Sequence, residues 1–492
     1  MAIEWTKHMK LSKKSFLSLG LFAVLGVGAC SVNPATGDRQ FTALLPAERE
    51  EAVGAQEHEK IRAQLGNFMT GPIAEYVEGI GERIVPHTER KDVEYKFFVI
   101  DDPMINAFAV PGGYIYVSRG LMALANSEAE LAAVIAHEIG HVTARHSAER
   151  VSQSFLVGLG AAAIGAVAGD PGISQAAGLG SELFVKSYSR TQEHEADNLG
   201  VRYSARAGYD PNAMSTFLKV LDGQTKLDSR LAGRKQSNFN YFSTHPVTSE
   251  RVSRTSAQAK EFSVANPMVN RDGYLRKISD LTYGDSADQG FVRGNTFYHP
   301  EIGFKFTVPE SSKIVNSQKA VTSKHPNGTI IIFDMGKTQD AIDPLSYIKT
   351  VWLRDQKLGN AENITVNGMR AATASFTGTV QNRSVTIRLV AIEWSPGKFF
   401  RFQMAIPKNV NSAFMDELKK TTYSFKKMTA SEKQSIRPKR IQLVTAKSGD
   451  SFATMGKKMA VDELPAEQFM ALNGLTSNDR LVAGRQYKII VN

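Results

Sequence analysis

The chain has 492 residues, a formal net charge of +10 and 42% hydrophobic residues. This length predicts two to four domains, and the composition is ordinary for globular protein. The basic residues are scattered and form no stripe interleaved with aromatic side chains, so we expect no nucleic-acid partner and at most a mild attraction to acidic polymers or a membrane surface. A single cysteine, Cys30, excludes an intrachain disulfide.

The N-terminal segment has the features of an export signal. Lysines precede the apolar run Phe16–Gly28, which is too short to cross a bilayer comfortably. Small residues lead directly into Cys30, which resembles a bacterial lipobox, in which the cysteine becomes the lipidated first residue of the mature protein. We therefore expect residues 1–30 to be a lipoprotein signal peptide. An ordinary signal peptide, or a buried helix with a chance cysteine, is the alternative.

The next stretch alternates between helical and extended patterns. An edge strand can pair with an extended peptide through main-chain hydrogen bonds, and Asn106, Ala107 and Phe108 are our candidates for a substrate-binding strand of this kind. A plain core strand is the alternative. The expected elements are helices over Pro46–Gln64 and Ile73–Ile84, and strands over Val93–Ile100, Asn106–Val110 and Gly113–Ser118.

A His-Glu-x-x-His motif organises the chain. Its helix begins at a capping box that starts with Ser127, and residues four apart share one face of a helix. His137 and His141 can therefore bind one Zn²⁺, while Glu138 lies beside the metal and can take a proton from a metal-bound water. The alternative is an ordinary helix with two surface histidines.

A second acidic helix supplies candidates for a third ligand. Glu193 and Asp197 are four residues apart, so they share a face. Glu193 suits the third zinc ligand, and Asp197 can accept the remaining N–H of a ligand histidine and fix its tautomer. His194 and Glu195 are expected to point elsewhere, into solvent or behind the ligands. A charged surface helix is the alternative.

These two motifs resemble those of the zinc metallopeptidases of the HtpX and CAAX-prenyl protease (Ste24-type) family, and in particular its periplasmic lipoprotein members of the BepA and LoiP kind. The resemblance covers roughly Asn33 to Val252. It implies a mainly helical gluzincin fold with one zinc per chain. It also implies that His137, His141 and Glu193 are the ligands, Glu138 the base and Asp197 a residue behind the ligands.

Three further features lie near the motifs. Phe155–Gly169 is apolar and too short for a membrane span; we expect a buried helical hairpin, with a mobile lid or membrane-facing loop as the alternative. His245 precedes a proline, and we expect it to donate to an oxyanion or to occupy the open zinc position; a surface histidine is the alternative. Arg145 and His146 are expected to cap the zinc helix by charge.

The remaining sequence predicts two more domains. Residues 290–427 carry strand alternation with two helices, which predicts an antiparallel α+β domain with a faint resemblance to PsbP-like and Mog1-like domains. Residues 441–492 resemble a LysM module, a βααβ unit that in its family binds peptidoglycan. The expected organisation is a signal peptide at 1–30, a zinc peptidase domain at 31–260, a connector at 261–289, the α+β domain at 290–427, a linker at 428–440 and the LysM-like module at 441–492.

The sequence as a whole predicts a multidomain α+β zinc endopeptidase of the bacterial cell envelope. The expected location is the periplasm, with the protein anchored by Cys30, at the outer membrane of a Gram-negative cell. The expected substrates are misfolded or stalled envelope proteins, and peptidoglycan is a candidate partner of the C-terminal module. The alternative is a non-catalytic envelope lipoprotein that acts as a chaperone or peptidoglycan-binding adaptor.

Overall fold

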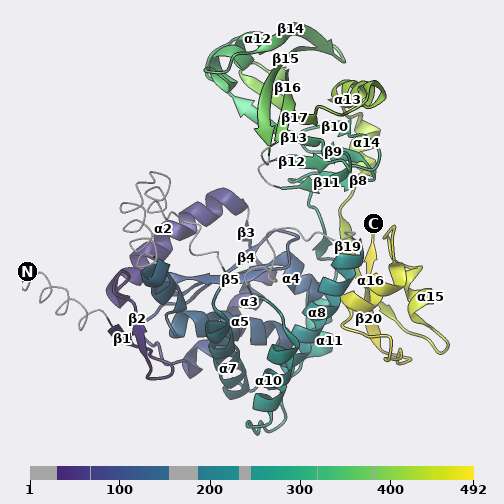
Figure 1. Ribbon diagram of the computed structural model, residues 1–492. Coiled ribbons are helices and arrows are strands. Elements are labelled where there is room, and N and C mark those ends of the chain that lie inside the picture. Colours follow the sequence, from purple (N-terminus) through teal and green to yellow (C-terminus); the bar gives the residue numbers. More distant parts are fainter. Residues whose placement is uncertain (1–29, 67, 155–186, 232–244, 318–319, 381–382) are drawn as a thin grey trace, which may run out of the picture. The chain divides into compact units, whose positions relative to one another are not determined.

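The chain forms two compact units (Figure 1). Unit 1 comprises Asn67–Ser279, the N-terminal segment up to Ala63 and the C-terminal stretch Leu443–Ile489, and unit 2 is built mainly from Asp280–Gln442. The residues that the computed structural model describes are 30–66, 68–154, 187–231, 245–317, 320–380 and 383–492. The signal peptide predicted before Cys30 and the apolar stretch Phe155–Gly169 lie outside these residues.

Unit 1 contains a small sheet surrounded by helices (Figure 1). The strands follow the order β3-β4-β6-β5, so β5 is an edge strand. The elements before the C-terminal stretch are β1 (Cys30–Val32), β2 (Arg39–Phe41), α2 (Ala47–Leu65), β3 (Phe68–Met69), α3 (Pro72–Ile84), η1 (Val85–His87), β4 (Lys96–Ile100), β5 (Ala107–Val110), η2 (Pro111–Gly113), β6 (Tyr114–Ser118), α4 (Arg119–Leu124), α5 (Glu128–Thr143), α7 (Arg190–Arg206), α8 (Ala213–Leu231), α10 (Ser249–Ala259) and α11 (Arg271–Ile278).

The sheet of unit 1 presents an aromatic face to α2. His58 of α2 lies 4.5 Å from Phe98 and 5.4 Å from Tyr114 between ring centroids, and its Nδ1 lies 2.8 Å from the Tyr116 hydroxyl. Next to the sheet, α3 approaches β4 closely, because a side chain at Gly81 would overlap the ring of Phe97. Helix α5 packs against β5, β6, α7 and α8, which places the His-Glu-x-x-His motif in the interior.

The C-terminal stretch of unit 1 contains α15 (Phe452–Gly456), α16 (Pro465–Leu472) and β20 (Gln486–Val491). Lys488 joins it to the rest of the unit. Its side chain is fully buried, and its ammonium group donates hydrogen bonds to the carbonyl oxygens of Ala123, Leu124 and Ala125, at 2.7, 3.0 and 2.8 Å. These carbonyls belong to the last two residues of α4 and to Ala125, which caps that helix. The LysM resemblance of this stretch stays a prediction.

Unit 2 is built on antiparallel sheets. A seven-stranded sheet has the order β11-β12-β13-β17-β16-β15-β14, and a four-stranded sheet has the order β18-β10-β9-β8. The elements are β7 (Thr282–Tyr283), β8 (Phe291–Arg293), β9 (Thr296–His299), β10 (Phe304–Thr307), β11 (Lys313–Asn316), β12 (Val321–Lys324), β13 (Ile330–Lys337), α12 (Pro344–Tyr347), η5 (Ile348–Trp352), β14 (Gly359–Val366), β15 (Met369–Val380), β16 (Arg383–Ser395), β17 (Lys398–Pro407), α13 (Ser412–Ser424), β18 (Lys426–Lys427), α14 (Ala430–Ser435) and β19 (Lys439–Thr445).

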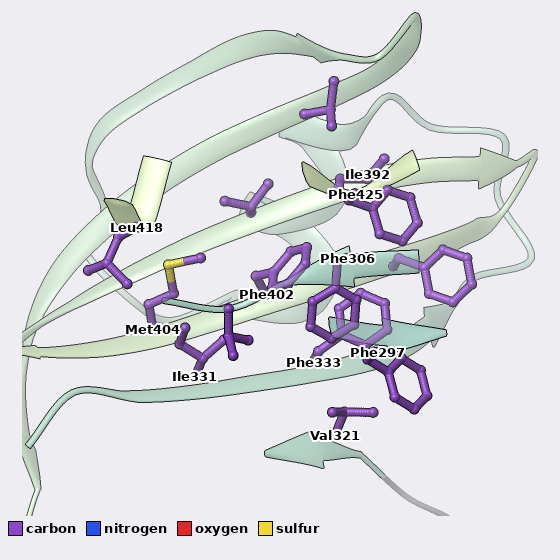
Figure 2. Packing of buried hydrophobic residues seen from close by; sticks show 14 of the residues in the cluster. Phe297, Phe306, Val321, Ile331, Phe333, Ile392, Phe402, Met404, Leu418 and Phe425 are labelled. Carbon is purple, nitrogen blue, oxygen red and sulfur yellow. The ribbon is translucent and has the colours of Figure 1, made fainter. Parts of the chain in front are cut away.

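The main core of unit 2 is rich in phenylalanine. Figure 2 shows Phe297, Phe306, Phe333, Phe402 and Phe425 among the buried side chains that pack together. Ring centroids in this cluster lie as close as 4.4 Å, in tilted arrangements that aromatic pairs prefer. The multidomain α+β class predicted from the sequence is therefore confirmed.

Two stretches differ in detail from the sequence-based expectations. Within the strand alternation predicted for 290–427, the run Tyr298–Pro309 is divided between the two strands of a hairpin, β9 and β10, because Gly303 turns the chain with a φ of 93°. The expected polar connector at 261–289 contains α11, which is part of unit 1 and has buried Tyr274, Leu275 and Ile278 side chains. Three apolar side chains spaced along this short helix outweigh the polar composition around them.

Candidate metal centre

Helix α5 brings the two histidines of the motif together. Ser127 caps the helix by accepting a hydrogen bond from the Glu130 amide. His137 and His141 lie one turn apart, fully buried, with their Nε2 atoms 3.1 Å from each other. Two converging nitrogens at this spacing are suited to bind one metal ion, because the ion can accept a lone pair from each imidazole.

Helix α7 crosses α5 closely enough to add a carboxylate. Glu193 is buried, with one oxygen 3.7 Å from His137 Nε2 and the other 3.6 Å from His141 Nε2. The helices approach at glycines, since a Cβ at Gly200 would lie 3.1 Å from the His137 backbone and one at Gly140 would lie 3.1 Å from Leu199 Cβ.

His245 completes a four-residue cluster. Its Nδ1 lies 2.8 Å from a Glu193 oxygen and 3.4 Å from His137 Nε2, and its ring is 1% exposed. One potential ligand atom from each of His137, His141, Glu193 and His245 falls within 4.8 Å of all the others. Burial lowers the pKa of His245, but the facing carboxylates of Glu193 and Glu138 outweigh burial and raise it above its ordinary value.

Glu138 stands beside this cluster with an unusual lack of partners. It is fully buried, and within the described part of the chain neither carboxylate oxygen accepts a hydrogen bond. The nearest charged neighbour is His245, whose Nε2 lies 3.6 Å from Glu138 Oε1. Burial raises the pKa of the Glu138 carboxyl, against the opposing effect of His245 and His137. A carboxylate with this environment binds a proton readily, as a general base must.

Asp197 and Arg251 lie behind the cluster. Asp197 faces His137 Nδ1 at 3.1 Å, and Arg251 holds both Asp197 oxygens, at 2.7 and 2.8 Å. Arg251 also lies 2.8 Å from Glu193. Burial tends to raise the pKa of Asp197, but the charge and hydrogen bonds of Arg251, with a contribution from His137, lower it to about 2. The carboxylate is therefore ionised and lies where it would favour the proton of His137 on Nδ1, which would leave Nε2 for a metal.

His146, Glu195 and Tyr188 also contact the site, in addition to the expected ligands and base. His146 Nδ1 lies 2.8 Å from His141 Nδ1, and the Tyr188 ring stacks on His141 with centroids 3.7 Å apart. Glu195 lies 3.3 Å from His146, while His194 is directed towards Glu250. The expectation that Arg145 and His146 cap the helix by charge is wrong.

Arg145 and His146 have other partners because the chain turns sharply after α5. The guanidinium group of Arg145 binds Glu50 and the Leu45 carbonyl oxygen, each by a hydrogen bond of at most 2.8 Å. His146 binds His141 instead of the end of the helix. The only sequence signal for this arrangement is a third histidine five positions after His141.

The residues present fit a zinc ion. Zinc takes imidazole nitrogens and carboxylate oxygens, usually with three protein ligands in a catalytic site. Burial and the neighbouring His137, His146 and His245 hold the pKa of His141 well below its ordinary value, so this imidazole is neutral, as a ligand must be. His137, His141 and Glu193 would hold the ion, and His245 is placed to reach it.

Comparison with known proteins agrees with this geometry. Residues 73–259, from α3 to the end of α10, match the family described as "Peptidase family M48". The chain contains a peptidase M48 domain. M48 peptidases are zinc-dependent metallopeptidases, and all four residues of the cluster lie within the M48 domain.

The relatives that match this part of the chain include bacterial proteases and mitochondrial metalloendopeptidases of eukaryotes. The chain is 29% identical over 218 residues to the beta-barrel assembly-enhancing protease of Escherichia coli (strain K12), which covers 42% of this chain and 43% of that protein. It is 29% identical over 238 residues to the mitochondrial metalloendopeptidase OMA1 of Schizosaccharomyces pombe, covering 47% and 67%. The OMA1 of Arabidopsis thaliana is 36% identical over 168 residues, covering 34% and 32%. The chain thus spans less than half of the bacterial relative that it matches.

Proposed function

We propose that this protein is a zinc-dependent endopeptidase in which Glu138 is the general base. The observation that carries the proposal is the buried, unpartnered carboxylate of Glu138 beside the cluster of His137, His141 and Glu193. A bound zinc supplies a polarised water as the nucleophile. Glu138 takes the proton of the attacking group and later donates it to the leaving amine, and its raised pKa suits both transfers.

The edge strand β5 is the proposed binding site for an extended substrate. Within the described residues β5 pairs only with β6, so its other edge could offer main-chain hydrogen bonds that tolerate many sequences. Asn106 precedes the strand and is 1% exposed, and neither its side-chain nitrogen nor its side-chain oxygen has a partner within the described residues. A buried amide without partners is costly, and pairing with a substrate backbone would satisfy it. Ala107 and Phe108 extend the same strand.

His245 has two proposed roles that the geometry supports equally. Its Nδ1 hydrogen-bonds Glu193 and its Nε2 faces Glu138, so the ring lies between a ligand and the base. As a fourth ligand it would exclude the catalytic water and hold the enzyme latent. As a hydrogen-bond donor it would stabilise the oxyanion of the tetrahedral intermediate.

The proposed location is the bacterial cell envelope, with Cys30 lipidated and the protein anchored at the outer membrane. The lipobox-like residues before Cys30 support an anchor, and the Escherichia coli relative named as a beta-barrel assembly-enhancing protease supports misfolded or stalled envelope proteins as substrates. Within the described residues, we find no helix of sufficient length and hydrophobicity to cross a bilayer. The C-terminal stretch is proposed to bind peptidoglycan, on its resemblance to LysM.

The substitution Glu138→Gln tests the proposed chemistry, because glutamine keeps the size of the side chain and cannot accept the proton. We expect zinc to remain bound at one ion per chain, while cleavage of an unfolded test protein falls by about 10²-fold or more. Glu78→Gln on the exposed surface of α3 is the matched control and should leave both measurements unchanged. Parental cleavage by the Glu138 variant would exclude Glu138 as the base. A chain that binds no zinc would instead favour the non-catalytic adaptor.

A further inference from the structure

The end of the metal-binding helix contains a strained turn that aims a third histidine at the site. Helix α5 ends at Thr143, and Arg145 adopts a left-handed conformation with φ 58°, which is unfavourable for a residue with a side chain. The turn brings His146 back along the helix, where its Nδ1 lies 2.8 Å from His141 Nδ1 with the two rings inclined at 70°. Both histidines are 1% exposed.

The contacts continue from His146 to the start of the described chain. His146 Nε2 lies 3.3 Å from one oxygen of Glu195 on α7. The other oxygen of Glu195 accepts a hydrogen bond of 2.5 Å from the side-chain amide of Asn33, which is buried. Asn33 follows Cys30 by only three positions.

Asn33 is held in place by the turn between β1 and β2. Its side-chain oxygen accepts from the Ala35 amide at 2.9 Å, so the side-chain nitrogen is the end that faces Glu195. Its backbone pairs with Asp38 at 2.7 Å and with Gly37 at 2.9 Å. These bonds hold the side-chain amide nitrogen of Asn33 in place as a hydrogen-bond donor. An aspartate at this position could not replace it, because an ionised carboxylate offers only acceptors.

We propose that Asn33, Glu195 and His146 form a positioning relay that orients the ligand His141, so that the segment directly after Cys30 is part of the metal centre. The Glu195 carboxylate favours the proton of His146 on Nε2, which leaves His146 Nδ1 as an acceptor. His141 then donates from Nδ1 and presents the Nε2 lone pair to the ion. His137 is oriented by the Asp197 carboxylate directly, whereas His141 is oriented through a second imidazole.

The N-terminal segment also holds the turn from which His146 projects. Arg145 donates to Glu50 Oε1 at 2.7 Å and to the Leu45 carbonyl oxygen at 2.8 Å, and its Nη1 lies 3.3 Å from the hydroxyl of Ser31. Ser31 stands next to Cys30. The same segment therefore contacts both residues of the turn, Arg145 directly and His146 through Glu195.

Zinc affinity, measured by competition with a chromophoric chelator, tests the relay independently of catalysis. His146→Phe keeps the ring volume and removes both nitrogens, and we expect zinc to bind about 10- to 100-fold more weakly. Asn33→Ala, at the far end, should weaken binding by a smaller factor. His194→Ala is the control, because His194 lies next to Glu195 on α7 and is directed towards Glu250 instead of His146. It should leave the affinity unchanged.

The double variant separates a relay from unrelated structural effects. If Asn33 acts through His146, Asn33→Ala should have no further effect on zinc affinity once His146→Phe is present. Equal losses in both backgrounds would overturn the proposal. Should His146→Phe fail to fold, the pair Asn33→Ala and Glu195→Gln gives the same comparison at the outer end of the relay.

The inference rests on the proposed zinc site, and the two can fail separately. A parent protein that binds no zinc overturns both. A parent that binds zinc with the same affinity as the His146 and Asn33 variants overturns the relay and leaves the proposed peptidase intact.

Discussion

The buried Lys488 provides the sharpest test of how the C-terminal stretch is joined to the M48 domain. Its ammonium group donates to three backbone carbonyl oxygens, those of Ala123, Leu124 and Ala125, and its side chain is fully buried. The perturbation we choose is Lys488→Met, which keeps an unbranched side chain and removes the donors. The three carbonyl oxygens then lose their partner without access to water.

The expected loss of stability follows from these contacts. An unsatisfied buried polar group costs about 1–3 kcal/mol, and three carbonyls at the lower end of that range give about 3 kcal/mol. The middle of the range for three carbonyls is about 6 kcal/mol, and methionine also removes the cost of burying an ammonium group, which is several kcal/mol, so the net loss is again about 3 kcal/mol. For a unit of roughly 300 residues, a loss of this size lowers Tm by about 4–5 °C.

Thermal unfolding of the full chain, followed by circular dichroism, measures this shift. Lys457→Met is the matched control, since Lys457 lies in the same stretch and is exposed. Its Tm should equal that of the parent. A Tm for Lys488→Met within about 1 °C of the parent would show that the three bonds do not hold the stretch in place.

Three further predictions concern the release of zinc by acid, the anchor at Cys30 and the role of His245. Acid should release zinc before it unfolds the protein, because imidazole ligands must be neutral to bind the ion. The pKa of Asp197 is depressed to about 2, so the stability that this carboxylate contributes is complete above about pH 4 and is lost only as the pH falls towards 2. Simultaneous loss of zinc and of the near-UV circular dichroism signal would contradict this prediction. Cys30→Ser should move the protein from the membrane to the soluble periplasmic fraction, and unchanged fractionation would require another anchor. His245→Ala should lower kcat by about 10²-fold if the imidazole is an oxyanion donor and raise activity if it is a fourth ligand, and unaltered turnover with unaltered zinc content would exclude both roles.

The elements with strong local signals are the ones that the sequence predicts well. The capping box at Ser127 and the absence of proline after it place the start of α5 correctly. Helix α7 begins at a capping box of Ser189 and Gln192, a local signal that the sequence prediction of this helix did not use. Because both helices are defined locally, the four-residue spacing of their polar side chains carries over directly into three dimensions, and His137, His141 and Glu193 fall into one cluster.

The residues that sequence reasoning missed depend on long-range contacts. His146 reaches His141 only because Arg145 adopts a left-handed conformation, and no residue near Arg145 in the sequence predicts that turn. The sequence places Glu195 in solvent or behind the ligands, but it gives no sign that Asn33, 162 positions away, is a partner of the Glu195 carboxylate. Lys488 lies in the stretch expected to be LysM-like, and the sequence gives no sign that its ammonium group is buried against carbonyl oxygens far away in the chain.

The three acidic residues of α7 show how close helix packing divides one short sequence among several partners. Glu193 and Asp197 share a face, and the approach of α7 to α5 at Gly200 and Gly140 brings that face within reach of His137. A side chain at position 200 would meet the His137 backbone at 3.1 Å and push α7 away, so the hydrogen-bonding distance between Asp197 and His137 depends on glycine at the crossing. Glu195 points to another side of α7 and would be an ordinary surface residue, if the turn after α5 did not bring His146 around to meet it. The metal centre is therefore set by two backbone features, a glycine crossing and a left-handed turn, as much as by the ligand residues.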